Sequence, residues 1–218
     1  MNHYQHPSLL LLTIHPQNPQ PREVAKAVQC LQSGGVIIIP TDSVYAFACN
    51  SEDHDAIEKV FRLIGKKPEK ANLSLLCYDL KHLADYCTQV ENQVFRLMKQ
   101  CVPGPYTFIL DANNRVPKVF RNRSKKTVGI RVPDNAIVHE VVKLLGVPLV
   151  SATVHNQNGE EGYTTNPEDL YETWGNRVDM LIDGGIGEEE VTSVLQCTGG
   201  KVEIIREGKG DLKELLRY

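Results

Sequence analysis

The sequence predicts a mixed α/β protein, built as one layered domain in which helices flank a twisted mixed β-sheet. Two observations predict it. Short apolar runs of strand length alternate with amphipathic stretches of helix length along the chain. The 218 residues are 41% hydrophobic and contain no internal repeat or linker, so a single sizeable core can form. We expect a loose lead-in over residues 1–20 and one domain over residues 21–218.

Five segments carry apolar residues at helical spacing and are bounded by helix start or stop signals. Proline suits the first helical turn, Ser, Asp and Asn cap free N–H groups, and glycine closes helix ends. Glycines stand at 34–35 and at 146, where the first and fourth of these helices would end. The expected helices begin at Pro21, at Ser51 or Asp53, at Glu91, at Asp134 and at Pro167.

The apolar runs between these helices are short and rich in β-branched residues, which favours buried strands. Several are bounded by proline, which cannot continue a sheet ladder. The expected strands lie at 36–39, 45–49, 73–77, 106–110, 127–132, 148–152, 178–182, 191–195 and 202–205.

Charge and composition exclude several classes of protein. The chain has 24 Lys+Arg against 27 Asp+Glu, a net charge of −3, so bulk charge does not bind nucleic acid, although a local basic patch could. No apolar stretch reaches the roughly 18 residues of a membrane span, and the run 9–12 lacks the flanks of a signal peptide. The six cysteines have no metal-ligand spacing. We expect a cytoplasmic protein with reduced thiols, no membrane partner and no metal ligated by side chains.

Three small polar residues stand between two expected buried strands. Thr41, Asp42 and Ser43 are residue types that favour tight turns. The ends of strands in α/β sheets also hold ligands, and hydroxyl groups there can orient them. The segment is therefore either a turn or part of a binding site.

Two stretches concentrate positive charge. Residues 62–70 carry four cations and one carboxylate, which suits a solvated helix end or a phosphate site. Residues 112–133 carry seven cations and no carboxylate, which favours a polyanion such as a nucleotide or RNA. Arg131 interrupts an apolar strand, so its guanidinium faces either a ligand or a buried carboxylate. The seven cations are Arg115, Lys118, Arg121, Arg123, Lys125, Lys126 and Arg131.

Two more segments interrupt the core pattern. Residues 151–155 bring two hydroxyl groups and His155 to a strand end, where a lone histidine is either a surface residue or a ligand contact. Residues 184–187, Gly-Gly-Ile-Gly, predict a turn rather than a nucleotide loop. No Ser-His-Asp order, G-x-S-x-G elbow or P-loop is present, so no protein nucleophile is predicted.

These segments, in this order, resemble the YrdC-like family of threonylcarbamoyl-AMP synthases over about residues 34–208. Residues 40–46, Pro-Thr-Asp-Ser-Val-Tyr-Ala, are similar to the family's Pro-Thr-Asp/Glu-Thr-Val-Tyr-Gly segment. Residues 129–133, Gly-Ile-Arg-Val-Pro, are similar to its Gly-Val/Ile-Arg-Val/Met-Pro segment. The similarity is greatest to the YciO branch, which shares Phe-Arg-Leu-Met-Lys at 95–99. Further similarities lie at 103–110 and 205–208.

The resemblance implies a twisted mixed sheet around a concave basic cavity. It also implies the condensation of L-threonine, bicarbonate and ATP into threonylcarbamoyl-AMP and pyrophosphate, for the threonylcarbamoyladenosine modification of tRNA. Mg²⁺ would arrive with ATP. The resemblance assigns threonine to Ser43, Arg131, Thr192 and Ser193. It assigns the nucleotide to Lys66, Lys67, Asn72, Thr127, Thr153, His155 and Arg206.

The chain departs from the family at the phosphate-binding motifs. The family's Lys-x-Arg-Pro stands here as residues 65–68, Gly-Lys-Lys-Pro, which keeps two cations but loses the bidentate guanidinium. Its Ser-x-Asn stands as residues 153–155, Thr-Val-His, and a downstream histidine is replaced by Cys77. One charged contact is worth about 1–3 kcal/mol, so we expect weak ATP binding and slow turnover.

Two other functions fit the same residues. One is a non-catalytic protein that binds double-stranded RNA, tRNA or the ribosome through the basic cavity; some family members are described as binding double-stranded RNA. The other is a carbamoyl or adenylyl transfer enzyme that uses a different amino acid.

Overall fold

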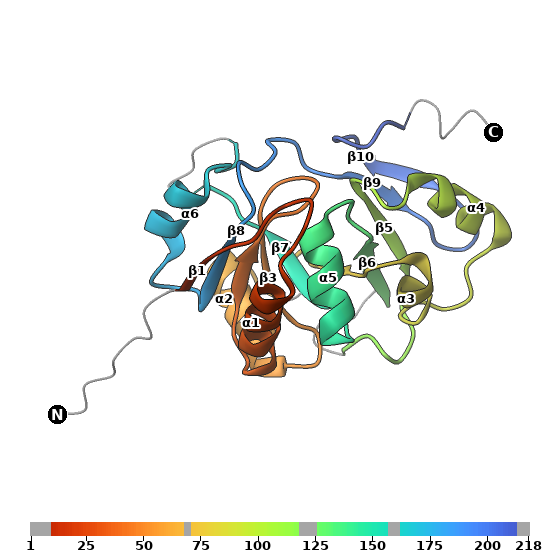
Figure 1. Cartoon of the computed structure of the whole chain (residues 1–218). Coiled ribbons are helices and arrows are strands. Elements are labelled where there is room, and N and C mark those ends of the chain that lie inside the picture. The colour runs from red at the N-terminus through yellow and green to blue at the C-terminus, as the bar shows by residue number, and fades with distance from the viewer. Residues whose placement is uncertain (1–9, 68–70, 118–125, 157–161, 213–218) are drawn as a thin grey trace.

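A computed structural model describes residues 10–67, 71–117, 126–156 and 162–212 of the chain. Within these ranges, ten strands form one mixed sheet in the order β1-β8-β2-β3-β7-β4-β6-β5-β9-β10 (Figure 1). The strands are β1 (Leu10–Thr13), β2 (Ile37–Ile39), β3 (Ala46–Asn50), β4 (Ser74–Leu76), β5 (Tyr106–Asp111), β6 (Thr127–Arg131), β7 (Leu149–Thr153), β8 (Met180–Asp183), β9 (Ser193–Gln196) and β10 (Glu203–Arg206).

The expected α/β layered architecture is confirmed, and each of the nine expected strands has a counterpart in the sheet. One strand was not expected. Leu10–Thr13, within the stretch taken for a loose lead-in, form edge strand β1 and pair in parallel with Met180–Asp183. Only Leu12 of this strand is buried, at 4% exposed, whereas Leu10 and Leu11 are 45% and 42% exposed, so the strand contributes one side chain to the core.

Six helices of the described residues pack on the sheet. They are α1 (Pro21–Gln32), α2 (His54–Ile64), α3 (Leu80–Ala84), α4 (Asn92–Cys101), α5 (Ala136–Leu145) and α6 (Pro167–Trp174). Asp53, rather than Ser51, caps α2, because its carboxylate accepts the Ala56 N–H at 2.9 Å. The helix expected from Asp134 begins two residues later, because Asn135 caps it. The short α3 was not expected.

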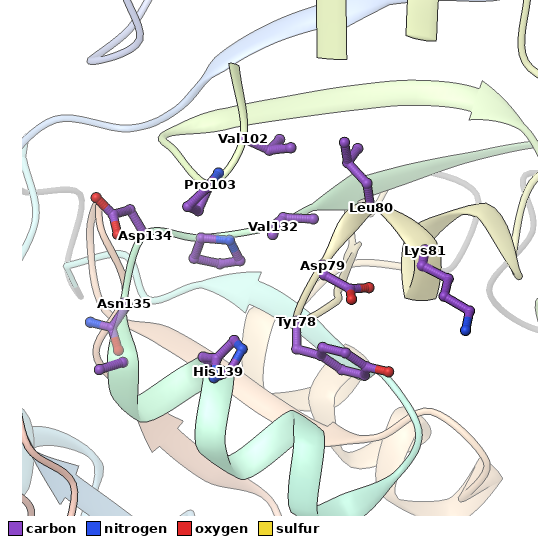
Figure 2. Close-up of a pocket in the computed structure, with 12 residues that line it drawn as sticks. Tyr78, Asp79, Leu80, Lys81, Val102, Pro103, Val132, Asp134, Asn135 and His139 are labelled. Carbon is purple, nitrogen blue, oxygen red and sulfur yellow. The ribbon is translucent and has the colours of Figure 1, made fainter. Parts of the chain in front are cut away.

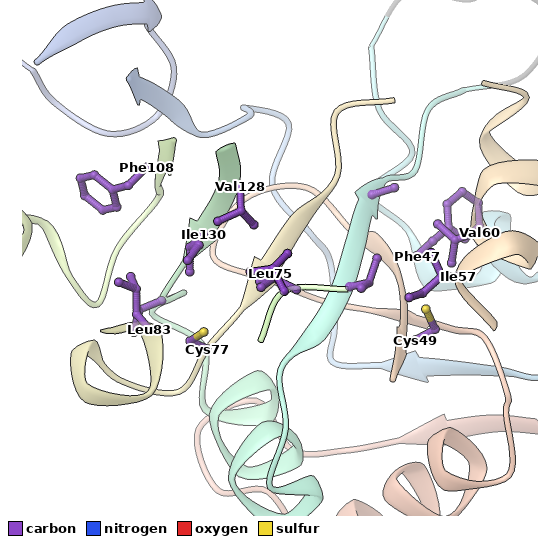
Figure 3. Close-up of a cluster of buried hydrophobic side chains, with 14 of the residues drawn as sticks. Phe47, Cys49, Ile57, Val60, Leu75, Cys77, Leu83, Phe108, Val128 and Ile130 are labelled. Carbon is purple, nitrogen blue, oxygen red and sulfur yellow. The ribbon is translucent and has the colours of Figure 1, made fainter. Parts of the chain in front are cut away.

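The core has two layers because the sheet buries both faces. Alternate side chains of one strand point to opposite sides. Leu75 and Val150 pack in a cluster with residues of α2, α4 and α6, whereas Leu76 and Leu149 pack in a cluster with α1 and α5. Figure 3 shows the first cluster running from Phe47 to Phe108. Burying each such side chain is worth about 1.5–3 kcal/mol.

Cys77, which stands at the family's histidine position, belongs to this first cluster (Figure 3). Its side chain is fully buried, and burial raises the pKa of the thiol well above its ordinary value of 9.0. The thiol is therefore protonated and acts as a small apolar side chain. All six cysteines are unpaired.

No helix within the described residues has both the length and the apolar character needed to cross a membrane.

Candidate functional site

Among the described residues, no helix packs on about half of one sheet face. On the sheet face that α1 and α5 cover, Leu76 of β4 and Leu149 of β7 belong to the core cluster. Further along the same face, β4 and β7 carry polar side chains instead, namely Ser74, Ser151 and Thr153. No described residue of β5, β6 or β9 belongs to that cluster. The strand residues on this half include small and hydroxyl-bearing side chains together with the partly exposed Ile109, and the hydroxyl groups suit polar contacts with a ligand. In β5, β6 and β9 these strand residues include Thr107, Thr127, Gly129 and Val194.

Arg131, at the end of β6, forms a buried ion pair. Its Nη2 donates to Oδ1 of Asp42 at 2.7 Å and to the Ser43 hydroxyl at 3.0 Å. The other carboxylate oxygen of Asp42 accepts the Asp134 N–H at 2.9 Å. Asp42 is therefore the buried carboxylate that the sequence left open as the partner of Arg131. It also joins the loop after β2 to the start of α5.

The Nε of the Arg131 guanidinium is a buried donor that is not used within the described residues. It has no hydrogen-bond partner among them, although the whole residue is 7% exposed. Burial lowers the pKa of Arg131, Asp42 opposes this, and the positive charge of Arg206 adds to it. A buried N–H without a partner costs about 1–3 kcal/mol, which an acceptor atom of a ligand would recover.

The loop at 40–45 is both a turn and a wall of this site. The Thr41 hydroxyl accepts the Ser43 N–H at 3.0 Å and donates to the Val44 carbonyl at 2.9 Å, which closes the turn. Tyr45 reaches the glycine turn after β8, where its hydroxyl donates to the Gly185 carbonyl at 2.7 Å. A Cβ at Gly187 would lie 2.7 Å from the Tyr45 ring, so this close approach requires glycine.

Arg206 and Thr192 lie together beside this region. The Arg206 Nε and Nη2 donate to the Thr192 carbonyl at 3.1 and 2.9 Å. The Thr192 and Thr107 hydroxyls form a hydrogen bond of 2.8 Å, which ties this loop to β5 on the open face. The contacts orient Arg206 without neutralising it, because a carbonyl carries no net charge.

Ser193 has a different environment from the other expected threonine ligands. Its hydroxyl donates to the Gly210 carbonyl at 2.6 Å and accepts the Gly208 N–H at 2.9 Å, and the residue is fully buried. These bonds satisfy the hydroxyl within the protein. Ser193 therefore holds the segment 206–210, which we call the strap.

Lys209 of the strap was not expected in the site. Its Nζ donates to the Asp42 carbonyl at 2.8 Å and pairs with Glu188 at 3.0 Å. The strap, the loop at 40–45 and the loop after β8 thus meet at one ammonium group. A lysine in a short C-terminal motif gives no sequence signal for this role, because its partners lie 21 and 167 residues away.

Three of the expected nucleotide residues, Asn72, Thr127 and Thr153, lie at one end of the open half-face. In the parallel ladder Ser74 pairs with Gly129, so Asn72 and Thr127 lie at the same end of β4 and β6. Ser74 also pairs with Ser151, which brings Thr153, the last residue of β7, to that end.

Electrostatic interactions connect His155, which follows β7 at this end, with Arg206 and, through Arg206, with Arg131. Burial, followed by the positive charges of Lys66 and Arg206, lowers the pKa of His155 below its ordinary 6.5. The charge of Arg206 also acts on Arg131. Arg206 therefore acts on both His155 and Arg131, and Lys66 acts on His155, which places these four side chains within electrostatic reach of one another.

The lost phosphate motif has a local cause in the fold. Gly65, which stands where the family has its lysine, is the C-cap of α2 with φ 63° and ψ 23°. This left-handed conformation favours glycine and ends the helix, and Lys66 and Lys67 then follow as exposed side chains.

Part of the second cationic stretch can be placed. Arg115 forms an exposed ion pair with Asp85 at 3.1 Å, which neutralises it. Lys126 is exposed just before β6. Lys118, Arg121, Arg123 and Lys125 lie outside the described residues. Those described residues contain no cluster of three or more His, Cys, Asp or Glu that could hold a metal ion.

Residues 29–208 match the family of Sua5, YciO and YrdC proteins, which carries the description "telomere recombination". The chain belongs to this family. Its relatives include YciO of Escherichia coli K12, an uncharacterised protein that is 40% identical over 203 residues, or 93% of this chain and 97% of that one. Threonylcarbamoyl-AMP synthase of Bos taurus is 31% identical over 193 residues, which cover 84% of this chain and 66% of the bovine one.

Solved structures of the Sua5/YciO/YrdC family have the same architecture. E. coli YciO superposes with a TM-score of 0.89 at 38% identity, covering 95% of this chain and all of that one. Sua5 of P. abyssi, solved in complex with L-threonine, has a TM-score of 0.82 at 21% identity and covers 91% of this chain and 57% of that one. The family and the fold expected from the motifs are both confirmed.

Proposed function

We propose that the chain is a nucleotidyltransferase of the threonylcarbamoyl-AMP synthase type, acting on ATP, L-threonine and bicarbonate. The observation that supports this is the buried Arg131 with its unpartnered Nε, within electrostatic reach of Arg206 and beside an open half of the sheet. The relationship to the bovine synthase supports it too, as does the shared fold with a Sua5 that was solved with L-threonine.

The threonine end is built around Arg131. Its unpartnered Nε is a buried donor beside the Ser43 hydroxyl, and an amino-acid carboxylate would supply the missing acceptor. Asp42 fixes the guanidinium through its Nη2. The Thr192 hydroxyl, held by Thr107, is the second hydroxyl at this end.

The nucleotide end uses exposed cations. Lys66 and Lys67 would meet the phosphates, and Arg206 would lie between the phosphates and the amino acid. The remaining contacts would come from polar side chains at the same end of the open half-face, namely Asn72, Thr127, Thr153 and His155. Mg²⁺ bound to the triphosphate would neutralise part of its charge.

The reaction needs positioning and charge neutralisation rather than a protein nucleophile. The amine of threonine combines with bicarbonate to give a carbamate and water. A carbamate oxygen then attacks the α-phosphorus of ATP, and pyrophosphate leaves. Fixed cations around the reacting phosphates supply the stabilisation that such a displacement requires. Two lysines in place of a bidentate arginine hold the phosphates less firmly, so turnover is slow.

Pyrophosphate release tests this function. Purified protein with ATP, bicarbonate and L-threonine should release pyrophosphate, and omission of threonine should stop the release. Arg206→Ala should reduce it, whereas Arg115→Ala, which removes an exposed cation already paired with Asp85, should not. No release with threonine would contradict the proposal. Release with another amino acid alone would identify a related transferase, and retention of RNA without any release would identify a binding protein.

A further inference from the structure

A cavity lies beyond the carboxyl end of β6, next to Arg131 of the proposed site. It has a volume of about 580 Å³ and opens where the parallel strands β4 and β6 end. Its walls come from residues 78–81 after β4, residues 132–136 after β6, and Val102-Pro103 before β5. The carboxyl ends of parallel strands are a common place for ligands, and the volume suits a small organic molecule.

The cavity is apolar with ring-bearing walls. Figure 2 shows Tyr78 on one side, His139 on the other, and Val132 and Pro103 above them. The Tyr78 and His139 rings stand at 90° to each other with centroids 6.0 Å apart. An aromatic face beside apolar walls favours a ligand with an alkyl stem, and it attracts a cationic head group.

Two carboxylates in the lining indicate that the ligand of this cavity is positively charged. Asp79 and Asp134 both line the cavity. Asp79 uses Oδ1 to accept the His82 N–H at 2.7 Å, which leaves acceptor capacity on the second oxygen. The amino end of α5 opposes a cation, but a helix end contributes about half a charge and Asn135 caps it. The ammonium of Lys81 extends away from His139 and Asp134 in Figure 2.

We propose that this cavity binds an alkylguanidinium or alkylammonium group. The stem packs on Val132 and the proline rings, the cation meets the carboxylates of Asp79 and Asp134, and Tyr78 presents its ring beside it. The proposal does not depend on the reaction proposed above, because none of these side chains was assigned to ATP or threonine there, although the Asp134 N–H donates to Asp42 and so joins the two regions. The site has the opposite charge preference from the basic open half-face.

Calorimetric titration with agmatine, which carries an alkyl guanidinium, tests the proposal on the full chain. The matched variant is Asp79→Asn, because asparagine caps a helix as well as aspartate and removes only the charge. We expect agmatine to bind and Asp79→Asn to weaken it about tenfold or more. Lys81→Ala should leave the affinity unchanged or improve it.

Three results would overturn the proposal. They are the absence of agmatine binding at millimolar concentration, equal affinity in Asp79→Asn with unchanged thermal stability, and binding of inorganic phosphate that Lys81→Ala abolishes. A second titration, with the blocked peptide acetyl-Gly-Arg-Gly-amide, distinguishes a free small molecule from an arginine side chain as the source of the cation. Binding of agmatine alone supports a free small amine, and binding of both supports an arginine side chain of a protein partner.

Discussion

At the scale of single residues, Asp42 has more structural roles than any motif position suggests. It pairs with Arg131, accepts the Asp134 N–H and offers its carbonyl to Lys209. Three segments far apart in sequence therefore depend on one side chain and its backbone. A buried ion pair of this kind costs most when only one partner is removed, because the other charge stays buried without compensation.

We expect Asp42→Asn to lower the free energy of unfolding by about 3 kcal/mol, measured by urea denaturation. Asparagine preserves the shape but leaves the Arg131 charge unpaired. Ser43→Ala is the control, and it should cost only about 1 kcal/mol, because it removes one neutral hydroxyl from the same guanidinium. Equal losses in the two variants would show that the charge of Asp42 is not what holds Arg131.

His155 reports on the basic region. Burial and the charges of Lys66 and Arg206 lower its pKa, so its NMR titration midpoint should lie below 6.5. Lys66→Ala removes one of these charges and should move the midpoint upward. Lys143→Ala, a lysine on α5 that does not act on His155, should leave it unchanged. If Lys66→Ala leaves the titration midpoint of His155 unchanged, His155 does not lie close to Lys66 in the folded protein.

Among the secondary-structure elements, the strap at 206–210 shows how a short segment can complete a site. Lys209→Met keeps the length of the side chain and removes the ammonium that joins Asp42 to Glu188. The pair is partly exposed, so the variant should cost less than about 1 kcal/mol of stability. We expect the KM for threonine in pyrophosphate release to rise severalfold with little change in KM for ATP. A change in the KM for ATP alone would mean that the strap acts on nucleotide binding and not on threonine binding.

Helix α3 contains a buried histidine with an unusual environment. Neither ring nitrogen of His82 has a hydrogen-bond partner among the described residues, and the ring lies between Tyr78 and Tyr86. Burial lowers its pKa below 6.5, against the raising effect of Asp79 and Asp85. Below pH 6.5 the unfolded chain therefore takes up a proton that folded His82 does not, and the free energy of unfolding falls.

His82→Phe should remove both the cost of the two unpartnered ring nitrogens and the loss of stability at low pH. Phenylalanine can stack in the same place without a polar atom to satisfy, so at pH 7 the variant should gain about 1 kcal/mol of stability. Urea denaturation at pH 7 and pH 5 checks it, and the gain should be larger at pH 5. A gain that is smaller at pH 5 would mean that His82 is protonated in the fold.

The elements that sequence patterns predicted were those with long or strongly marked signals. Helices α1, α2 and α6 had a proline or a capping side chain at the start, and the strands with β-branched runs were all found. The five residues of α3 are too few to show helical periodicity, and β1 has only four. Short elements are decided by what they pack against, which a local pattern does not contain.

For the whole molecule, the motifs were enough to predict the family but not the pairing of charges. Arg131 could be identified as a directed cation from its apolar strand, whereas its partner Asp42 lies 89 positions away. The roles of Ser193 and Lys209 were hidden for the same reason, since both depend on how the chain returns to the sheet after β10. Long-range contacts of single polar side chains leave no periodic trace in a sequence.

The arrangement of two substrate ends on one sheet predicts separable binding. Lys66→Ala/Lys67→Ala removes the exposed cations of the nucleotide end and leaves Arg131 and Ser43 intact. Ligand at 100 times its Kd stabilises a protein by about 2.7 kcal/mol, which a thermal shift detects. The double variant should lose most of the ATP-induced shift and keep the threonine-induced shift. Lys26→Ala/Lys143→Ala on α1 and α5 makes the same change in net charge on the helices of the covered half, and it should keep both. If the two double variants lose the ATP shift equally, overall charge and not a site at Lys66 and Lys67 attracts the nucleotide.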